Sequence, residues 1–139
     1  MSQPLVSVII PTFNRGYCLA EAISSVLNQS GFELIVVDDG STDNTQKVLQ
    51  KFPDIRTIPL PENRGVSYAR NRGIEVARGS LICFLDSDDL WEKGKLEAQV
   101  KWLQENSECQ VVYTDEKWIR NGVRVNPMNK HQKYSGDIF

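Results

Sequence analysis

The chain has 139 residues, of which 40% are hydrophobic and 24% are charged, and its formal net charge is −2. This length suits one domain of ordinary size, and the apolar content is sufficient for a hydrophobic core. The small negative charge argues against a nucleic-acid partner, because phosphate binding requires a surplus of Lys and Arg. No apolar run approaches the ~20 residues that span a bilayer, so the sequence predicts no transmembrane segment.

The three cysteines, Cys18, Cys83 and Cys109, are odd in number and widely spaced. This spacing indicates neither a disulfide framework nor a zinc site, and buried thiols in a reducing compartment are the simplest interpretation. The N-terminus also lacks the cationic start and long apolar stretch of a secretory signal. We therefore expect a cytoplasmic location, and association with the inner face of the membrane is compatible with it.

The first half of the chain alternates short apolar runs with amphipathic stretches. Pro11 follows the first run and is expected to end that strand. Apolar residues then recur at helical spacing from Leu19 to Leu27, and residues 41–45 are rich in side chains that cap a second helix. The predicted strands of this half span residues 5–10, 34–37 and, more weakly, 56–60.

The second half continues the same alternation. Its predicted elements are a helix over 66–77, a strand over 81–85, a helix over 92–105, a strand over 111–113 and a hairpin around Asn121-Gly122. Residues 127–139 are polar and show no period. Continuously apolar strands that alternate with amphipathic helices predict an α/β fold, with a mostly parallel sheet covered by helices on both faces.

Acidic residues follow two of the predicted strands. In an open parallel sheet, ligands bind beyond the carboxyl ends of the strands. Asp86 and Asp88 stand at one such end, where a divalent cation such as Mg²⁺ or Mn²⁺ would relieve their repulsion and bind a substrate phosphate as well. Asp39 stands at another end and could accept a hydrogen bond from the imide N–H of uracil. The alternative for all three carboxylates is that they only cap helices or form turns.

Several other chemistries have no supporting pattern. The first strand is not followed by the G-x-G-x-x-G fingerprint of dinucleotide-binding proteins, and no P-loop motif occurs in the chain. The single histidine, His131, lies in the irregular tail, so a Ser/His/Asp hydrolase constellation is not supported. A receiver-like signalling domain is a weak alternative, because receivers place their acidic pair after the first strand.

Four motifs, taken together, resemble a known family. They occupy residues 6–15, 36–43, 63–71 and 84–89. Their order and spacing are similar to those of the family 2 glycosyltransferases, which are inverting enzymes with the GT-A fold. The resemblance implies a nucleotide-sugar-binding domain over residues 1–115. Residues 116–139 would begin an acceptor-binding region, so we expect a fold truncated before the acceptor-binding half.

The resemblance also implies roles for individual residues. Thr12 would lie near the base, Asp39 would bind uracil, and Arg70 would contact the diphosphate or the sugar. Asp88, together with Asp86, would bind Mn²⁺ or Mg²⁺, which neutralises the leaving nucleoside diphosphate. The full set of donor-binding residues that it implies is Pro11, Thr12, Asn14, Asp39, Arg70 and Asp86.

The implied activity is metal-dependent, inverting transfer of a hexose from a nucleoside diphosphate sugar, with UDP-sugar the favoured donor. The acceptor would be a hydroxyl group of a glycan, lipid or protein, and the process would be cell-surface polysaccharide biosynthesis. The general base of the family is expected beyond Phe139. The alternative is a nucleotide-sugar-binding module that performs no chemistry by itself.

Overall fold

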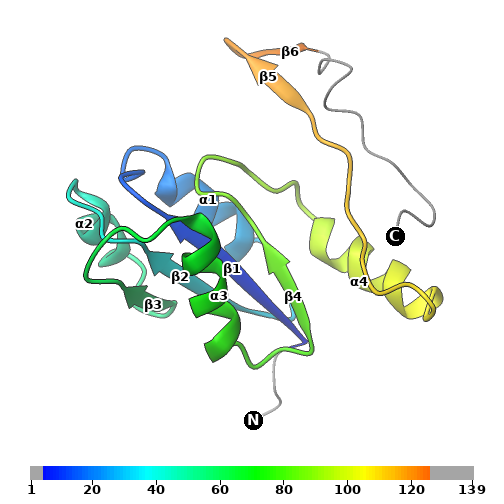
Figure 1. Ribbon diagram of the computed structural model, residues 1–139. Helices are drawn as coiled ribbons and strands as arrows, with labels where there is room; N and C mark the ends of the chain where they lie inside the picture. The colour runs from blue at the N-terminus through cyan, green and yellow to red at the C-terminus, as the bar shows by residue number, and fades with distance from the viewer. Residues whose placement is uncertain (1–4, 126–139) are drawn as a thin grey trace. The chain divides into compact units, whose positions relative to one another are not determined.

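The computed structural model describes residues 5–125. The chain divides into two compact units, the first ending at Ala98 and the second beginning at Gln99. In chain order the elements are β1 (Val6–Thr12), α1 (Leu19–Leu27), β2 (Phe32–Asp38), α2 (Thr45–Leu49), β3 (Arg56–Pro59), α3 (Val66–Val76), β4 (Leu81–Phe84), α4 (Lys95–Glu105), β5 (Trp118–Arg120) and β6 (Val123–Val125). Figure 1 shows them along the chain. The predicted domain boundary after Asp115 stays a prediction.

The first unit is built on a parallel sheet with the strand order β3-β2-β1-β4. The central strand β1 pairs with β2 along its whole length, from Val6 opposite Phe32 to Thr12 opposite Asp38. On its other side β1 pairs with the shorter β4. The chain therefore leaves β1 in one direction for β2 and β3 and returns to its opposite side as β4. Such a reversal of strand order places a crevice at the carboxyl ends of the strands, where α/β proteins bind ligands.

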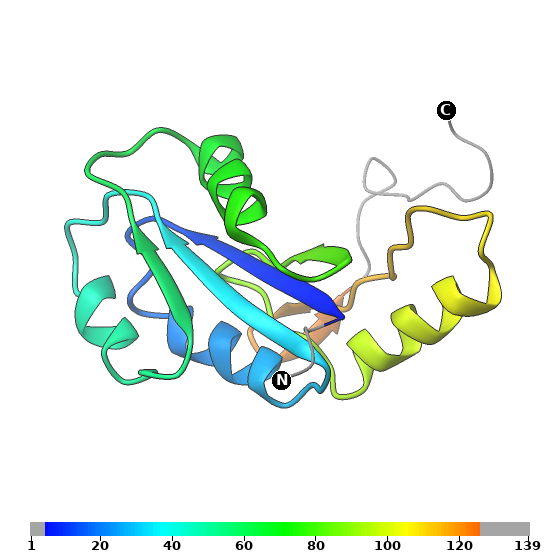
Figure 2. The same cartoon turned by 90° about the horizontal axis from the view of Figure 1, so that it is seen from below.

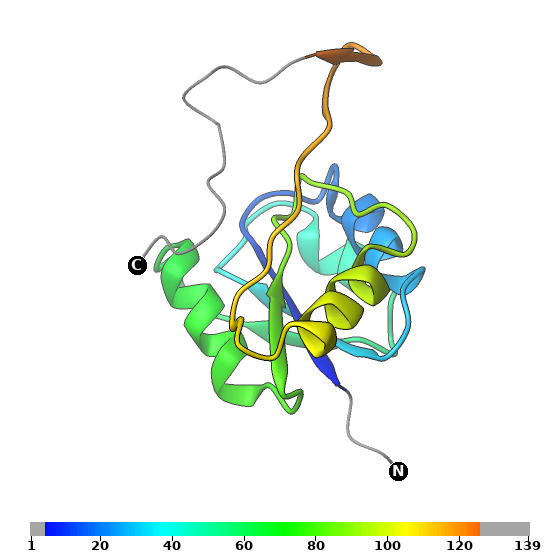
Figure 3. The same cartoon turned by 90° about the vertical axis from the view of Figure 1, so that its right-hand side faces the viewer.

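Helices cover both faces of this sheet, as predicted (Figures 2 and 3). Helix α3 lies on one face, where Ala69 packs with Ile9, Ile35 and Val37 in a buried cluster. Gly73 brings the same helix close to β1, since a Cβ atom there would lie 2.5 Å from Ile9 Cγ2. Helices α1 and α2 lie on the other face. Four residues of the apolar stripe of α1 are completely buried, namely Leu19, Ala22, Ile23 and Val26, whereas Leu27 at its end is 45% exposed.

The prediction that Pro11 ends the first strand was wrong, because β1 continues to Thr12. The carbonyl of Ile9 accepts from Leu85 N–H on the β4 side, whereas the carbonyl of Thr12 accepts from Asp39 N–H on the β2 side. Residues two apart face the same neighbour, so Pro11 also faces the β4 side. The β1–β4 ladder ends at the pair Ile9–Phe84, so the missing N–H of Pro11 interrupts no ladder bond.

The predicted strand over 111–113 was also wrong, because the structure has no strand at these residues. Val111 is 67% exposed, so the burial that favours an apolar strand is absent there. The hairpin in the second unit is confirmed: β5 and β6 pair antiparallel, and Asn121 and Gly122 between them have φ angles of 50° and 76°. Across residues 5–125 none of the helices is long and apolar enough to cross a membrane.

Candidate functional site

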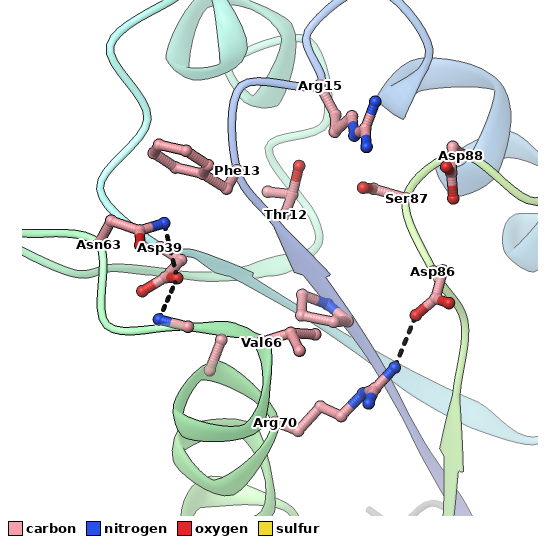
Figure 4. A pocket seen from close by; sticks show the side chains of 13 residues that line it. Thr12, Phe13, Arg15, Asp39, Asn63, Val66, Arg70, Asp86, Ser87 and Asp88 are labelled. Atoms are coloured by element: carbon pink, nitrogen blue, oxygen red, sulfur yellow. Dashed lines mark hydrogen bonds and ion pairs between the residues drawn. The ribbon is translucent and has the colours of Figure 1, made fainter.

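A pocket of about 410 Å³ lies at the carboxyl ends of the strands in the first unit (Figure 4). Its walls come from the segments that follow β1, β2 and β4 and from the first turns of α3. The lining residues are Pro11, Thr12, Phe13, Arg15, Asp39, Asn63, Gly65, Val66, Ala69, Arg70, Asp86, Ser87 and Asp88. All residues proposed from sequence except Asn14 are therefore brought together in one place.

The carboxylate of Asp39 is hydrogen-bonded to the segment that leads into α3. It is 3% exposed and accepts hydrogen bonds from the backbone N–H groups of Arg64 and Gly65, at 2.8 and 2.9 Å, and from the side-chain amide of Asn63 at 3.1 Å. These groups immediately precede Val66, the first residue of α3. A carboxylate at this position satisfies N–H groups near the helix start and interacts favourably with its dipole.

Gly40 allows this arrangement by its backbone conformation. Its φ angle is +77°, which side-chain-bearing residues rarely adopt, and a Cβ atom would lie 2.6 Å from the carbonyl carbon of Glu62. The turn after β2 therefore passes directly against the segment that leads into α3. The Asp39-Gly40 pair joins these two walls of the pocket.

Asn14 is the predicted site residue that does not line the pocket. Its side-chain oxygen accepts from the backbone N–H groups of Thr42 and Asp43, at 2.8 and 3.2 Å, and its own N–H donates to Ser41 Oγ. Asn14 has a φ angle of 50°, a left-handed conformation that Asn tolerates better than most residues. It therefore links the segment after β1 to the segment after β2.

Two further aspartates, one at the end of β2 and one after it, also bond within the protein. Asp38 is 2% exposed, accepts from Ser41 N–H at 3.0 Å and is hydrogen-bonded by the side chain of Gln46. Asp43 accepts from Thr45 and from the N–H of Gly16. Burial would raise the pKa of Asp43, but the hydrogen bonds from Thr45 and Gly16 outweigh it and hold that pKa below its usual value.

The β4 side of the pocket carries carboxylates in a different environment. Asp86 forms an ion pair with Arg70 at 2.8 Å, and the Arg70 guanidinium also lies 5.6 Å from the centre of the Phe84 ring. The Asp86 side chain is nevertheless 52% exposed. Asp88 is exposed and makes neither a hydrogen bond nor an ion pair within residues 5–125. Its charge contributes, after the Tyr17 hydroxyl, to raising the pKa of Arg15 across the pocket.

Two buried polar atoms of pocket residues have no hydrogen-bond partner within residues 5–125. They are the hydroxyl oxygen of Thr12, a residue that is 3% exposed, and Nε of Arg70. An unsatisfied buried polar group typically costs about 1–3 kcal/mol. Both atoms belong to residues that line the pocket, so a polar ligand there could supply the missing hydrogen bonds.

The acidic rim suits a cation that is shared with a ligand better than a cation held by protein alone. Among residues 5–125, no group of three or more His, Cys, Asp or Glu side chains is placed to hold a metal ion. Asp86 and Asp88 supply two carboxylates on either side of Ser87. One or two carboxylates plus substrate phosphates are a common donor set for Mg²⁺.

A comparison with profiles of protein families identifies the family of this chain. The profile described as "Glycosyl transferase family 2" matches residues 7–136. The chain belongs to glycosyl transferase family 2. The pocket therefore lies in the part of the chain that the family shares, and the predicted family membership is confirmed.

Curated relatives agree with this assignment. The chain is 43% identical over 118 residues to a Bacillus subtilis protein whose assignment as a glycosyltransferase of teichuronic acid biosynthesis is provisional; the match covers 81% of this chain and 46% of the relative. It is 39% identical over 111 residues to an Escherichia coli UDP-Glc:α-D-GlcNAc-diphosphoundecaprenol β-1,3-glucosyltransferase, covering 77% of this chain and 44% of the relative. The chain thus spans under half the length of these relatives.

Solved structures confirm the GT-A fold of the matched part. S. aureus TarS 1–349 in complex with UDP has a TM-score of 0.68 and 32% identity, over 73% of this chain and 32% of that one. A mannosyltransferase from Pyrobaculum calidifontis, in complex with GDP-Man and Mn²⁺, has a TM-score of 0.65 and 31% identity, over 73% of this chain and 33% of that one.

Sequence reasoning missed several pocket residues. Phe13, Arg15 and Asn63 lie within the motifs that carry the family resemblance, but the motifs indicated no role for them and no bond between Asn63 and Asp39. Ser87 is 7% exposed between two exposed aspartates. A lone D-x-D motif gives no sign that its middle residue is the buried one.

Proposed function

We propose that this chain binds a nucleoside diphosphate sugar in the pocket, with UDP as the nucleotide, for metal-dependent and inverting transfer of the sugar to an acceptor hydroxyl. The observation that carries the proposal is the buried Thr12 hydroxyl, which has no partner in a pocket that also holds Arg70, Asp86 and Asp88. Support for UDP comes from the UDP-bound structure of TarS and from the UDP-Glc-dependent relative.

The residues divide into two groups in this proposal. Thr12 and Asp39 bind the nucleoside, since both residues line the pocket and each is only 3% exposed. Asp39 has one hydrogen bond at Oδ1 and two at Oδ2, so Oδ1 retains the capacity to accept from the imide N–H of uracil. Arg70 binds the diphosphate or the sugar, and its pairing with Asp86 holds both side chains at the rim.

Asp88, with Asp86, is proposed to hold Mn²⁺ or Mg²⁺ together with the diphosphate. When bound, this ion stabilises the negative charge that develops on the leaving nucleoside diphosphate. We assign no general base among the described residues, because each pocket carboxylate already has another role. Asp39 holds the start of α3, Asp86 pairs with Arg70, and Asp88 serves the cation.

A Thr12→Val variant tests the proposal, because valine has the shape of threonine with a methyl group in place of the hydroxyl group. Its affinity for UDP in the presence of Mn²⁺ should fall about tenfold, which corresponds to a lost hydrogen bond of roughly 1.4 kcal/mol. Its free energy of unfolding should stay constant or rise, since an unsatisfied buried group is removed. Titration calorimetry and urea denaturation measure the two quantities.

Thr57→Val is the matched control, because Thr57 is an exposed residue of β3 outside the pocket. It should leave UDP affinity unchanged. A Thr12→Val variant that binds UDP as well as the parent would contradict the proposed role of the hydroxyl. Cytidine and guanosine diphosphates, titrated in parallel, test the choice of base: equal binding of UDP and CDP would remove uracil recognition by Asp39.

A further inference from the structure

The segment that carries Asp86 and Asp88 is attached to helix α1 by three side chains. These are Cys18, Ser25 and Gln29, which we call the α1 clamp. They stand just before, within and just after the helix, spaced by seven and four residues, so they lie along one face. The residues they bind lie 63–69 positions later in the sequence.

The first contact of the α1 clamp is made at the acidic loop itself. Cys18 Sγ donates to the carbonyl oxygen of Ser87 at 3.4 Å. Burial raises the pKa of the Cys18 thiol, so the thiol stays protonated and remains a donor. Asp89 N–H also donates to the carbonyl of Asp86 at 3.0 Å, which closes a tight turn around Ser87. The peptide between the two carboxylates is therefore fixed from both sides.

The other two contacts fix the chain that leaves this turn. Ser25 Oγ accepts from Trp91 N–H at 3.1 Å and donates to the carbonyl of Ala22 at 2.7 Å. The Gln29 amide accepts from Leu96 N–H at 3.0 Å and donates to the carbonyl of Glu92 at 2.9 Å. The side-chain nitrogen and oxygen of Gln29 thus both bond to the same segment, which attaches that segment to the end of α1 at two points.

We propose that the α1 clamp positions Asp86 and Asp88 for a divalent cation, with Ser25 and Gln29 as positioning residues that touch neither cation nor nucleotide. The inference rests on the proposed function. The two carboxylates are exposed, so burial does not fix them, and the ion pair with Arg70 holds only Asp86. The hydrogen bonds to α1 fix the backbone that carries both of them. Groups that orient metal ligands typically change metal affinity 10–100-fold when they are removed.

The test uses the 139-residue chain with the double change Ser25→Ala and Gln29→Met, which removes three of these hydrogen bonds. UDP affinity is measured by calorimetry in Mn²⁺ and in EDTA. We expect the affinity gain from Mn²⁺ to fall about tenfold, whereas affinity in EDTA stays within about twofold of the parent. Amide hydrogen exchange of residues 86–92 in EDTA should become faster.

Ser24→Ala with Gln50→Met is the matched control, because both side chains are exposed and make none of the clamp contacts. An unchanged gain from Mn²⁺ in the clamp variant would overturn the inference. Equal losses of UDP affinity in Mn²⁺ and EDTA would overturn it too, because they indicate a general structural defect. If the double variant does not fold, Ser25→Ala alone carries the same comparison. A parent chain without any gain from Mn²⁺ would contradict the proposed function itself.

Discussion

The two acidic loops of the first unit contain the same type of residue at the same edge of the sheet, but their environments differ. After β2, the carboxylates of Asp38, Asp39 and Asp43 all accept hydrogen bonds from the protein. After β4, Asp86 has one arginine partner and Asp88 has no hydrogen-bond partner within residues 5–125. The first loop uses its charges to build the pocket, whereas the second leaves carboxylate oxygens open to solvent.

This difference shows that position at a strand end does not by itself make an aspartate a ligand-binding group. A carboxylate surrounded by backbone N–H groups is a structural acceptor, and removing it leaves those donors unsatisfied. An exposed carboxylate that lacks donors is free to bind a cation. Mutation separates the two roles. Removing a structural acceptor lowers the stability of the protein, whereas removing a cation-binding carboxylate lowers metal-dependent binding.

The largest expected effect is on the stability of an Asp39→Ala variant. The change leaves the N–H groups of Arg64 and Gly65 without their acceptor at the start of α3. We expect the free energy of unfolding to fall by about 3 kcal/mol, measured by urea denaturation. Asp88→Ala is the matched change in the other loop and should stay within about 0.5 kcal/mol of the parent. Similar losses in both variants would show that the loops do not differ in role.

The sheet and the common edge were predictable because they depend on local patterns and on topology. Continuous apolar runs identified β1, β2 and β4, and parallel strands necessarily bring their carboxyl ends together. Asp39, Asp86 and Asp88 were therefore placed at one rim without knowledge of any contact. Pro11 misled the prediction because its effect depends on which neighbouring strand its missing N–H faces and on how far the ladder with that strand extends.

The individual roles of the polar residues were not predictable in this way. Asn14 was expected in the pocket, but its side chain accepts from the loop after β2. Ser25 and Gln29 received no role, because their partners lie 63–67 residues away and no spacing rule connects them. Hydrogen bonds between distant segments depend on how the elements pack, which a single sequence does not state.

A smaller effect is expected for Asp43→Ala, which removes a carboxylate that accepts from the N–H and the hydroxyl of Thr45, the first residue of α2. The loss at pH 7 should be about 1 kcal/mol, since the residue is exposed and its bond to a backbone N–H at a helix start is comparable to that of a helix cap. The folded-state pKa of Asp43 lies below its unfolded value, so the charged carboxylate stabilises the protein above the unfolded pKa. The difference between parent and variant should therefore shrink as pH falls below about 4. A difference that is constant from pH 7 to pH 3 would contradict this role.

An Asp88→Ala variant shows whether the loop after β4 is the cation-binding side of a nucleotide pocket. UDP is titrated into the parent, into Asp88→Ala and into Asp54→Ala, each with Mn²⁺ and with EDTA. Asp54 is an exposed acidic residue outside the pocket, so its removal controls for the loss of one charge. We expect Mn²⁺ to strengthen UDP binding in the parent and in Asp54→Ala but not in Asp88→Ala. An undiminished effect of Mn²⁺ in Asp88→Ala would show that Asp88 does not bind the cation.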